Sequence, residues 1–568
     1  MKDNVIRIRL ISIAMIIFAM FLTTKLYFVQ IVSGDTFKER ADRQYVRPVG
    51  GVFDRGTIFF QAKDSTLMAA ASLKLGFTVA INPKILENPE DVYQKLSGLI
   101  TLNHDDFIAR ATKENDTYEE IAKRIEPDIA QKIDELKIVG VNLYKDKWRY
   151  YPGESLASHV LGFVGYNKDN EYGGRYGLEN QFDSVLERND ENVYVNFFAE
   201  VFSDLHKTFT DTGTVEGDIV STIEPNVQSF LEKQIEAVNN KFNAKLTAGI
   251  IIDPKTGEIY GMSAFPTFNP NSFGNERNVG VFTNPLVQNV YEMGSIIKPL
   301  TMAAGLDAGV VTANTTYYDK GFITLNNKTI YNYDKKGRGT VTMQDVLDES
   351  LNTGVAFVTS KLGNKRFSDY MYKFGFDKLT GIDLPNEARG LVDNLKSPRD
   401  VEHATASFGQ GIAISPIATV RALSSLANGG VLTTPHVVKQ IDYKVGFAKD
   451  ISYPQGERAV SEEASKEISR MLTEVVDTAL LNGSVKMDRY SIAAKTGTAQ
   501  IAVPGAGYHE DKYLHSFFGY FPAYNPRFLV FLYTVEPKGE AYASHTLTEP
   551  FMNTTKFLIN YYEIPPDR

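Results

Sequence analysis

The sequence predicts a multidomain protein of the α+β or α/β class, with one membrane anchor at the N-terminus and two domains after it. Three observations lead to this prediction. A single long apolar run occurs near the N-terminus. Residues 33–240 then mix short strand and helix patterns. Residues 241–563 carry apolar strands near both ends with helices between them, a pattern that favours a sheet whose first and last strands meet.

The composition fits a globular protein and excludes some functions. With 568 residues, the chain is long enough for two or three domains. Its formal net charge of −9 argues against a general nucleic-acid-binding protein. Cysteine is absent, which excludes disulfides and thiolate metal sites and suits an exported protein. The eight histidines are scattered, so we expect no metal or other cofactor, and His159 should be a hydrogen-bonded packing residue.

The apolar run near the N-terminus has the length of one membrane span. Residues 10–24 are almost entirely apolar, and seven mostly apolar residues follow Lys25. With the Lys25 side chain extended toward the membrane surface, about 20 residues are available for the span. We therefore predict a transmembrane anchor at residues 10–32. A cleaved signal peptide is the alternative, but no convincing small-x-small cleavage site follows the apolar core.

Charge around the anchor predicts its orientation. Residues 1–9 contain three basic side chains against the single acidic Asp3. Positive charge favours the cytoplasmic side, so residues 1–9 should form a cytoplasmic tail and the chain after the anchor should be extracytoplasmic.

The first domain after the anchor, residues 33–240, shows elements but no catalytic pattern. Helices are expected after residues 87–91, over 126–136, and from Glu224 to Asn239, where a proline occupies the first turn. Residues 192–201 have a strand pattern. We find no nucleophile–base pair and no phosphate-binding loop here.

The second domain, residues 241–563, begins with a hairpin. Residues 248–253 form a buried strand pattern, a Pro-Lys-Thr-Gly turn follows, and residues 258–264 return. Later elements follow in order. Helices are expected at 343–362, 416–428, 461–481 and 547–561, and strands at 491–500, 516–521 and 528–535.

One short stretch in this domain carries a candidate nucleophile and base. Ser295 and Lys298 are three residues apart, which places both side chains on one face of a helix. Pro299 indicates that regular helix does not run far upstream, so Ser295 should lie at a helix N-terminus, where negative charge is favoured. A neutral Lys298 could accept the Ser295 hydroxyl proton. Alone, the pattern is weak, because a chain this long contains about two Ser-x-x-Lys strings by chance.

Two further short motifs follow in the chain. Ser350-Leu-Asn352 lies in the expected 343–362 helix, and Lys495-Thr-Gly-Thr498 lies in the expected 491–500 strand. A second Lys-Thr-Gly, at Lys255, falls in the hairpin turn before Ser295, and we interpret it as turn chemistry only. Order and context give the three motifs their weight.

The ordered trio resembles the signature of penicillin-binding proteins and serine β-lactamases. Other stretches are similar to class B high-molecular-weight transpeptidases: Gly249–Ile259, Pro266–Asn271, Tyr291–Ser295, Phe408–Ile412, Ala427–Gly430 and Phe518–Pro522. Upstream stretches resemble the non-catalytic pedestal of that class: Arg55–Ile58, His159–Gly165 and Gly177–Glu179. The resemblance covers roughly residues 1–560. It implies an elongated, dimerisation-type pedestal at 33–240. At 241–563 it implies a transpeptidase domain, an antiparallel sheet flanked by helices as in serine β-lactamases.

Two positions depart from the pattern of the family. Met293 stands where the family usually has Pro, next to the nucleophile turn, and Phe59-Phe60 stands where it usually has Asp-Arg in the pedestal. The first departure concerns how the chain approaches Ser295. The second concerns a pedestal contact and not the chemistry.

The resemblance assigns a role to each motif residue. Ser295 would attack the penultimate D-Ala carbonyl of a stem peptide that ends in D-Ala-D-Ala, with Lys298 as base. Burial and the charge of Lys495 would lower the Lys298 pKa from its usual value of about 10.4. Ser350 would relay a proton to the leaving amine, and Asn352 would hold Lys298 and the donor backbone.

The third motif would bind the donor. Lys495, Thr496, Gly497 and Thr498 would form the site for its terminal carboxylate, and the backbone N–H groups of Ser295 and Thr498 would form the oxyanion hole. β-Lactams would acylate the same serine.

The resemblance also implies a setting and leaves alternatives open. It implies peptidoglycan cross-linking at the bacterial cell membrane, with a SEDS-type glycosyltransferase and other divisome or elongasome membrane proteins as partners. The form Ser350-Leu-Asn352-Thr-Gly favours the septal, FtsI-like members over elongation-type ones. A D,D-carboxypeptidase side activity is compatible with the same chemistry. Two alternative hypotheses remain. One is a β-lactam sensor or hydrolase, against which the long pedestal argues. The other is a catalytically silent scaffold for wall synthesis, against which the complete motifs argue.

Overall fold

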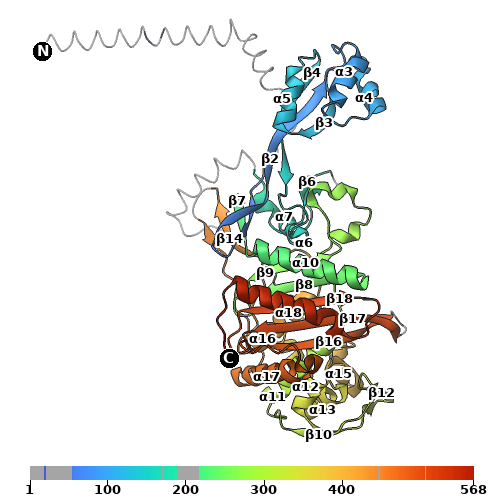
Figure 1. The fold of residues 1–568 in the computed structure, drawn as a ribbon, viewed down its shortest axis with the longest axis vertical. Helices are drawn as coiled ribbons and strands as arrows, with labels where there is room; N and C mark the ends of the chain where they lie inside the picture. Colours follow the sequence, from blue (N-terminus) through green and yellow to red (C-terminus); the bar gives the residue numbers. More distant parts are fainter. Residues whose placement is uncertain are drawn as a thin grey trace, which may run out of the picture. The chain divides into compact units, whose positions relative to one another are not determined.

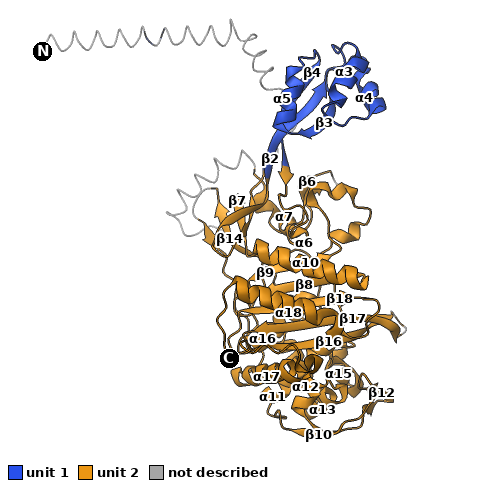
Figure 2. Cartoon of the chain, in the orientation of Figure 1, with its two compact units in different colours: residues 1–54, 73–148 blue, residues 55–72, 149–568 orange. Residues whose placement is uncertain are grey.

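The computed structural model describes residues 54–168, 170–188, 216–444, 448–503, 505 and 507–568, together with Phe18 and Met20. Among these residues, no helix combines the length and the apolar character needed to cross a bilayer. The predicted anchor at 10–32 lies outside the described residues apart from Phe18 and Met20, and so does the predicted strand at 192–201. The described chain forms two compact units, which Figure 2 distinguishes by colour: one contains residues 73–148, and the other residues 55–72 and 149–568.

The smaller unit packs helices on three strands. The second part of β2 (Leu67–Ile81) pairs with β3 (Glu119–Ile125) and β4 (Val141–Tyr150). The helices are α3 (Pro89–Ser97), α4 (His104–Ala111) and α5 (Pro127–Glu135). Both α3 and α5 begin at a proline, in segments where helices were predicted. Proline is tolerated there because an N–H group in the first turn of a helix has no acceptor within the helix. The strands and helices of this unit share a separate core, which includes Val79, Ile81, Val92, Leu96, Phe107 and Ile133.

The first part of the larger unit joins distant segments in one sheet. The strand order is β15 (Lys449–Asp450), β14 (Val438–Tyr443), β7 (Gly217–Ser221), β1 (Ile58–Gln61) and then β2. Short elements follow along the chain: α6 (Ser158–Leu161), β5 (Val164–Tyr166), β6 (Tyr172–Gly174), α7 (Gly177–Gln181) and α8 (Asp183–Leu186). Phe60 is buried in the core of this unit. At the position where the family usually has Asp-Arg, this chain therefore makes an apolar contact.

A buried ion cluster ties these segments together. Glu179 is fully buried and accepts hydrogen bonds from Arg55 Nε at 2.6 Å, Arg149 Nε at 2.5 Å and the Tyr151 hydroxyl at 3.1 Å. Burial opposes the Glu179 charge, but the two guanidinium groups outweigh it and lower its pKa. The Arg-Gly-Thr and Gly-Leu-Glu stretches seen in the sequence therefore meet at one carboxylate.

A five-stranded antiparallel sheet forms the centre of the larger unit (Figure 1). Its order is β16 (Ala493–Val503), β17 (Gly507–Phe521), β18 (Phe528–Val535), β8 (Leu246–Ile252) and β9 (Ile259–Phe265). The last strand, β18, pairs with the first, β8, from Leu529↔Ile252 to Val535↔Leu246. This pairing confirms the prediction that the first and last strands of this domain meet.

Helices cover both faces of that sheet. Alternate side chains of a strand point to opposite faces, and here Ile250 and Phe531 lie in one core while Ile251 and Val530 lie in another. The second core is completed by α10 (Pro225–Phe242) and α18 (Ala543–Tyr561), which pack against each other (Figure 1). Because both faces are buried, the strands are almost continuously apolar.

The other core is completed by a group of helices and two small antiparallel strand pairs. The helices are α11 (Lys298–Asp307), α12 (Met343–Asp348), α13 (Asn352–Leu362), α14 (Asn364–Lys373), α15 (Asp400–Ala406), α16 (Pro416–Ala427) and α17 (Glu462–Glu474). One pair joins β10 (Thr316–Asp319) to β13 (Gly339–Thr342), and between them in the chain β11 (Phe322–Leu325) and β12 (Lys328–Tyr331) form a hairpin. Single 3₁₀ or π turns are η2 (Pro270–Asn275), η3 (Val279–Phe282), η4 (Gly294–Ile297), η5 (Asp393–Lys396), η6 (Val475–Ala479) and η7 (Leu480–Gly483).

Three predicted helices differ from those observed. The 343–362 helix is interrupted between α12 and α13, where Ser350 adopts φ +55°. The 461–481 helix ends at Glu474 and continues as a π turn and a 3₁₀ turn. The closing helix starts at Ala543, ahead of the predicted Leu547, and contains Pro550. At Ser350 the contacts that accompany the break belong to the candidate site.

Candidate active site

Ser295 lies in a short 3₁₀ turn that leads directly into a helix. The turn is η4 (Gly294–Ile297), and α11 begins at Lys298 with Pro299 in its first turn. The prediction that regular helix does not run upstream of Ser295 is thus confirmed. Gly294 has φ +68°, which glycine adopts without the steric cost that a side chain would bring. Ser295 itself is half-buried, whereas Lys298 is fully buried.

Backbone-to-backbone contacts fix this turn. The Gly294 N–H donates to the carbonyl of Gly409 at 3.1 Å, and a Cβ on Gly409 would approach the Gly294 oxygen to 2.4 Å. On the other side, a Cβ on Gly497 would meet the Met293 oxygen at 2.9 Å and the Ile296 nitrogen at 3.0 Å. The Phe408–Ile412 loop and strand β16 therefore touch the turn at positions where only glycine fits.

Met293 meets this turn without distortion. Its φ of −84° is within the helical range, and its side chain is 1% exposed in the main core. Its carbonyl accepts a hydrogen bond from Ser516 Oγ at 2.8 Å. The approach to Ser295 is thus held by β17 and by core packing at the position where the family usually has Pro.

Lys298 is buried against Ser350. Its Nζ donates to the Ser350 carbonyl at 2.5 Å and lies 3.2 Å from Ser350 Oγ. Burial, and after it the positive charge of Lys495, hold the pKa of Lys298 well below its ordinary value. An amine with its pKa lowered in this way can act as a proton acceptor near neutral pH.

Lys495 approaches the same hydroxyl from strand β16. Its Nζ donates to Ser350 Oγ at 3.1 Å and to the Thr496 carbonyl at 3.2 Å. The side chain is 3% exposed, and burial lowers its pKa to about 8, opposed by the negative charge of Asp348. Burial in turn raises the pKa of Asp348 to about 6.

The Ser350 hydroxyl therefore links two buried lysines. A hydroxyl has two acceptor lone pairs and one proton to donate. When both lysine nitrogens donate to Ser350 Oγ, its own proton is left to point to a third group. This geometry makes Ser350 a connection through which a proton can move between the two amines.

Asn352 is placed beside the site but differs from our expectation. It is the first residue of α13, and its Nδ2 donates to the Tyr331 carbonyl at 2.8 Å. We predicted that Asn352 would hold Lys298. In the structure the Lys298 amine is held by Ser350, because the left-handed backbone of Ser350 turns its carbonyl as well as its hydroxyl toward that amine.

The third motif lies on an edge strand. β16 is the first strand of the five-stranded sheet, so half of its backbone groups face away from the sheet. Thr496 and Thr498 are half-buried and alternate with the buried Lys495 and Gly497. Thr498 Oγ1 accepts a hydrogen bond at 3.2 Å from the N–H of Ala543, the first residue of α18.

Three further positions support the site although the sequence reasoning did not single them out as functional. They are Asp348, which influences Lys495; Ser516, which holds Met293; and Gly409, which holds Gly294. The Phe408–Ile412 stretch was a visible signal for Gly409. No local signal marked Asp348 or Ser516, since their roles depend on the packing of distant strands.

Two expectations of structural roles are confirmed. Lys255 lies in the β8–β9 turn, where its N–H donates to Asp253 Oδ1 at 2.8 Å and Gly257 has φ +88°. His159 is buried and contacts the Val281 carbonyl at 2.9 Å, and burial lowers its pKa to about 4. In the part of the chain that the structure describes, no three His, Asp or Glu side chains gather in a way that suits a metal ion.

Comparison with known proteins identifies the family. The profile described as the penicillin-binding protein transpeptidase domain matches residues 247–555, and the profile of the penicillin-binding protein dimerisation domain matches residues 54–202. The chain belongs to the penicillin-binding protein family. The resemblance that the motifs suggested is thereby confirmed.

Individual relatives support the same conclusion. Stage V sporulation protein D of Bacillus subtilis is 30% identical over 94% of this chain and 82% of its own length. Peptidoglycan D,D-transpeptidase FtsI of Buchnera aphidicola is 26% identical over 97% of this chain and 94% of its own. Penicillin-binding protein 2X of Streptococcus thermophilus has the same fold, with a TM-score of 0.72 at 20% identity, over 90% of this chain and 81% of that one.

The contact between Gly497 and the serine turn predicts a sensitive position. A Cβ at Gly497 would lie 2.4 Å from Ser516 Oγ and 2.9 Å from the Met293 carbonyl oxygen, so in Gly497→Ala both Ser516 and the backbone contact between β16 and the turn must shift. We expect the rate of labelling by a fluorescent penicillin to fall about 100-fold, since an error of about 1 Å at a reacting centre has an effect of that size.

Gly274→Ala is the matched control, because a Cβ there meets nothing within 4 Å. It should be labelled at the wild-type rate. Circular dichroism should show both variants folded. Wild-type labelling of Gly497→Ala would contradict the close contact.

Proposed function

We propose that this protein is a serine-type peptidoglycan D,D-transpeptidase, which cross-links stem peptides through an acyl-enzyme on Ser295. One observation carries this proposal: two buried lysines, Lys298 and Lys495, share the Ser350 hydroxyl, and Lys298 begins the helix that directly follows the turn of the half-buried Ser295. Membership of the penicillin-binding protein family supports the same reaction.

In the first step Ser295 attacks a donor peptide that ends in D-Ala-D-Ala. The neutral Lys298 amine takes the hydroxyl proton, and Ser295 Oγ forms a bond to the carbonyl carbon of the penultimate D-Ala. The C–N bond to the last D-Ala then breaks. Its amine leaves with a proton delivered through Ser350, which Lys298 reprotonates. The enzyme is left as an ester, and D-Ala is released.

In the second step an amine of another stem peptide resolves the ester. It attacks the ester carbonyl and loses its proton to Lys298, and Ser295 Oγ recovers a proton as it leaves. A new peptide bond forms, and the serine is regenerated. Water in place of the amine would give D,D-carboxypeptidase activity.

The third motif suits the donor's negative charges. Lys495, with the hydroxyls of Thr496 and Thr498 along β16, would bind the terminal carboxylate, and Gly497 lets the strand approach the serine turn. The backbone N–H groups of Ser295 and Thr498 would form the oxyanion hole, in which each donor contributes about 3 kcal/mol in comparable sites. Asn352, anchored by Tyr331, would present its remaining amide groups to the donor backbone.

β-Lactams would acylate Ser295 in the same manner and remain attached. The match of residues 54–202 to a dimerisation domain supports a transpeptidase over a β-lactam-hydrolysing enzyme or a sensor. The burial of both lysines around Ser350 supports an active enzyme over a silent scaffold.

We further propose a membrane-bound setting, with residues 1–9 as a cytoplasmic tail and 10–32 as a single anchor. Residues 33–240 would form the pedestal and 241–563 the catalytic domain outside the membrane. A SEDS-type glycosyltransferase and other divisome or elongasome membrane proteins would be the partners. The apolar run and the basic residues before it support this topology.

Ser295→Ala tests the nucleophile. This variant should lose all covalent labelling by a fluorescent penicillin, because the only atom that forms the ester is removed, while its melting temperature stays close to that of the wild type. Ser360→Ala, at an exposed position of α13, should label normally. Stoichiometric labelling of Ser295→Ala would end the assignment.

The pH dependence of acylation tests the base. Neutral Lys298 is the active form, so the rate should rise as the pH increases through its lowered pKa and then level off. Lys495→Met removes a neighbouring positive charge, which raises the Lys298 pKa, so the rise should move to higher pH by about one unit.

The measurement is the second-order rate of penicillin acylation from pH 5 to 10, and the midpoint of the rise is compared because Lys495 also affects binding. Lys365→Met, at an exposed position, should leave the midpoint unchanged. An unmoved midpoint in Lys495→Met would contradict the coupling between the two amines.

A septal role is the finer proposal. The Ser350-Leu-Asn352-Thr-Gly form and the FtsI-named relative support it over elongation. A fluorescent fusion in growing cells should collect at midcell during constriction. Uniform side-wall fluorescence in dividing cells would instead favour an elongation-type enzyme.

A further inference from the structure

Ser350 holds a backbone conformation that its own chemistry disfavours. Its φ of +55° lies in the left-handed region, which is sterically unfavourable for a residue with a side chain. Such a conformation persists where surrounding contacts determine it. Two contacts come from within the site: Leu351 N–H donates to the Val346 carbonyl at 2.9 Å, and Lys298 donates to the Ser350 carbonyl. The others come from outside it.

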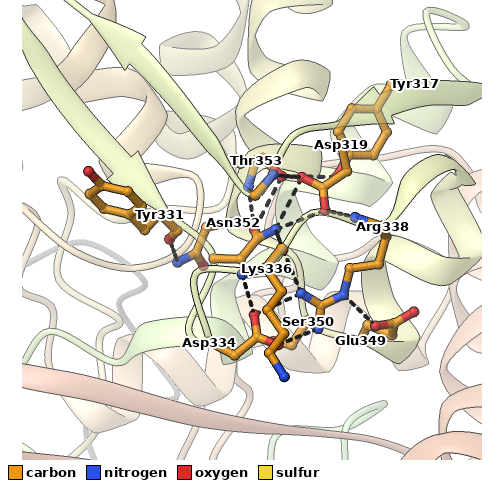
Figure 3. A network of polar contacts seen from close by, with 12 residues as sticks. Tyr317, Asp319, Tyr331, Asp334, Lys336, Arg338, Glu349, Ser350, Asn352 and Thr353 are labelled. Atoms are coloured by element: carbon orange, nitrogen blue, oxygen red, sulfur yellow. Dashed lines mark hydrogen bonds and ion pairs between the residues drawn. The ribbon is translucent and has the colours of Figure 1, made fainter.

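A buried carboxylate lies behind the Ser350–Asn352 loop. Asp319, at the end of β10, is 1% exposed and accepts hydrogen bonds from several donors. These are Gly321 N–H at 2.9 Å, Arg338 N–H at 3.1 Å, Asn332 Nδ2 at 3.0 and 3.1 Å, and Thr353 Oγ1 at 2.8 Å. Figure 3 shows Asp319 and Thr353 directed toward each other in this network. All donors but Thr353 come from the hairpin segment 316–342.

Thr353 connects this network to the motif, because it directly follows Asn352. Its N–H donates to Asn332 Oδ1 at 3.2 Å, and its hydroxyl also lies 3.0 Å from the Tyr317 hydroxyl. The Asn352 amide donates to the Tyr331 carbonyl from the same hairpin segment. The first turn of α13 is therefore attached to the hairpin segment by side-chain and backbone bonds.

The residue before Ser350 is attached as well. Arg338 Nε donates to Glu349 Oε2 at 2.7 Å, and its terminal nitrogens bind Asp334 at 2.7 and 2.9 Å (Figure 3). Glu349 is half-exposed, so this ion pair contributes less than the buried Asp319–Thr353 bond. Together the two connections hold the loop on both sides of Ser350.

We propose that Asp319, through its buried hydrogen bond to Thr353, is a positioning residue that keeps Ser350 and Asn352 in place for acyl transfer. This inference rests on the proposed function of the site. Asp319 acts from behind the loop, through Thr353, and not on the substrate.

Loosening this bond has a specific chemical consequence. Ser350 would relax toward a more favourable backbone conformation, and its carbonyl and hydroxyl would move away from Lys298. Water would then reach the amine. The charged groups that face Lys298 are Lys495 from β16 and, beyond it, Asp348 at the end of α12. With those unchanged, the lost burial raises the pKa of Lys298, so the acylation rate should rise at higher pH than in the wild type.

Three variants separate positioning from stability. Thr353→Val keeps the shape but removes the hydroxyl, which lies 2.8 Å from Asp319 Oδ1 and also 3.2 Å from Asn332 Oδ1 and 3.0 Å from the Tyr317 hydroxyl, and Thr353→Ser restores that hydroxyl. Asp383→Asn is the matched control: Asp383 is another buried carboxylate of the same unit, and it accepts from Val437 N–H, Val438 N–H and the Tyr453 hydroxyl. Each variant is assayed for its melting temperature and for the pH profile of fluorescent-penicillin acylation, with binding and acylation separated by stopped flow.

We expect the acylation step of Thr353→Val to slow about 10-fold, the effect of one buried hydrogen bond to a charged acceptor, with little change in the binding constant. Its pH midpoint should move upward. Thr353→Ser should recover most of the rate. Asp383→Asn should have a lower melting temperature but an unchanged pH midpoint of acylation.

The proposal is overturned if Thr353→Val acylates at the wild-type rate. It is also overturned if Asp383→Asn, at the same decrease in melting temperature, loses as much acylation rate as Thr353→Val and the pH midpoint of Thr353→Val does not move. Failure of the proposed function would give a different result. Either the wild-type protein would not be labelled by the fluorescent penicillin, or the Ser295→Ala variant would still be labelled.

Discussion

The arrangement of this protein depends on one hydroxyl shared by two buried amines. Lys298 reaches Ser350 from α11, and Lys495 reaches it from β16. Burial lowers the pKa of both amines, and at Lys298 the positive charge of Lys495 lowers it further. The pair is held together because the five-stranded sheet and the helices on its face are fixed by a large apolar core. That core supplies the burial, and burial is the main reason that the pKa of Lys298 lies below its ordinary value.

Close contact between backbones sets the position of the serine relative to this pair. Gly294, Gly409 and Gly497 come from three distant parts of the chain and meet around one turn. A side chain at either of the last two would force the neighbouring backbone away. The contact also explains why Met293 is accommodated: the turn is fixed by Ser516 and by these glycines and not by the rigidity of a proline.

Much of the site could be predicted from short patterns because acyl transfer needs particular groups at fixed spacings. Ser295 and Lys298 share a helical face, and the motif at Lys495 lies in an apolar strand, so the sequence was enough to name them. The Ser350 region could not be predicted in the same way. Its residues favour one continuous helix, but contacts with Lys298, Lys495 and the hairpin segment break that helix at Ser350. The same limitation applies to Asn352, which binds Tyr331 and not Lys298.

The sequence by itself determined the family, the order of the three motifs and the meeting of the first and last strands, since these follow from local residue types and from hydrophobic periodicity. The tertiary structure alone decided the left-handed backbone of Ser350, the buried hydrogen bonds of Asp319 behind it and the contacts that bury Lys298 against Ser350. The physical reason is common to all three. Strain, buried hydrogen bonds and desolvation depend on which distant segments surround a group, and no local pattern of residues records those neighbours.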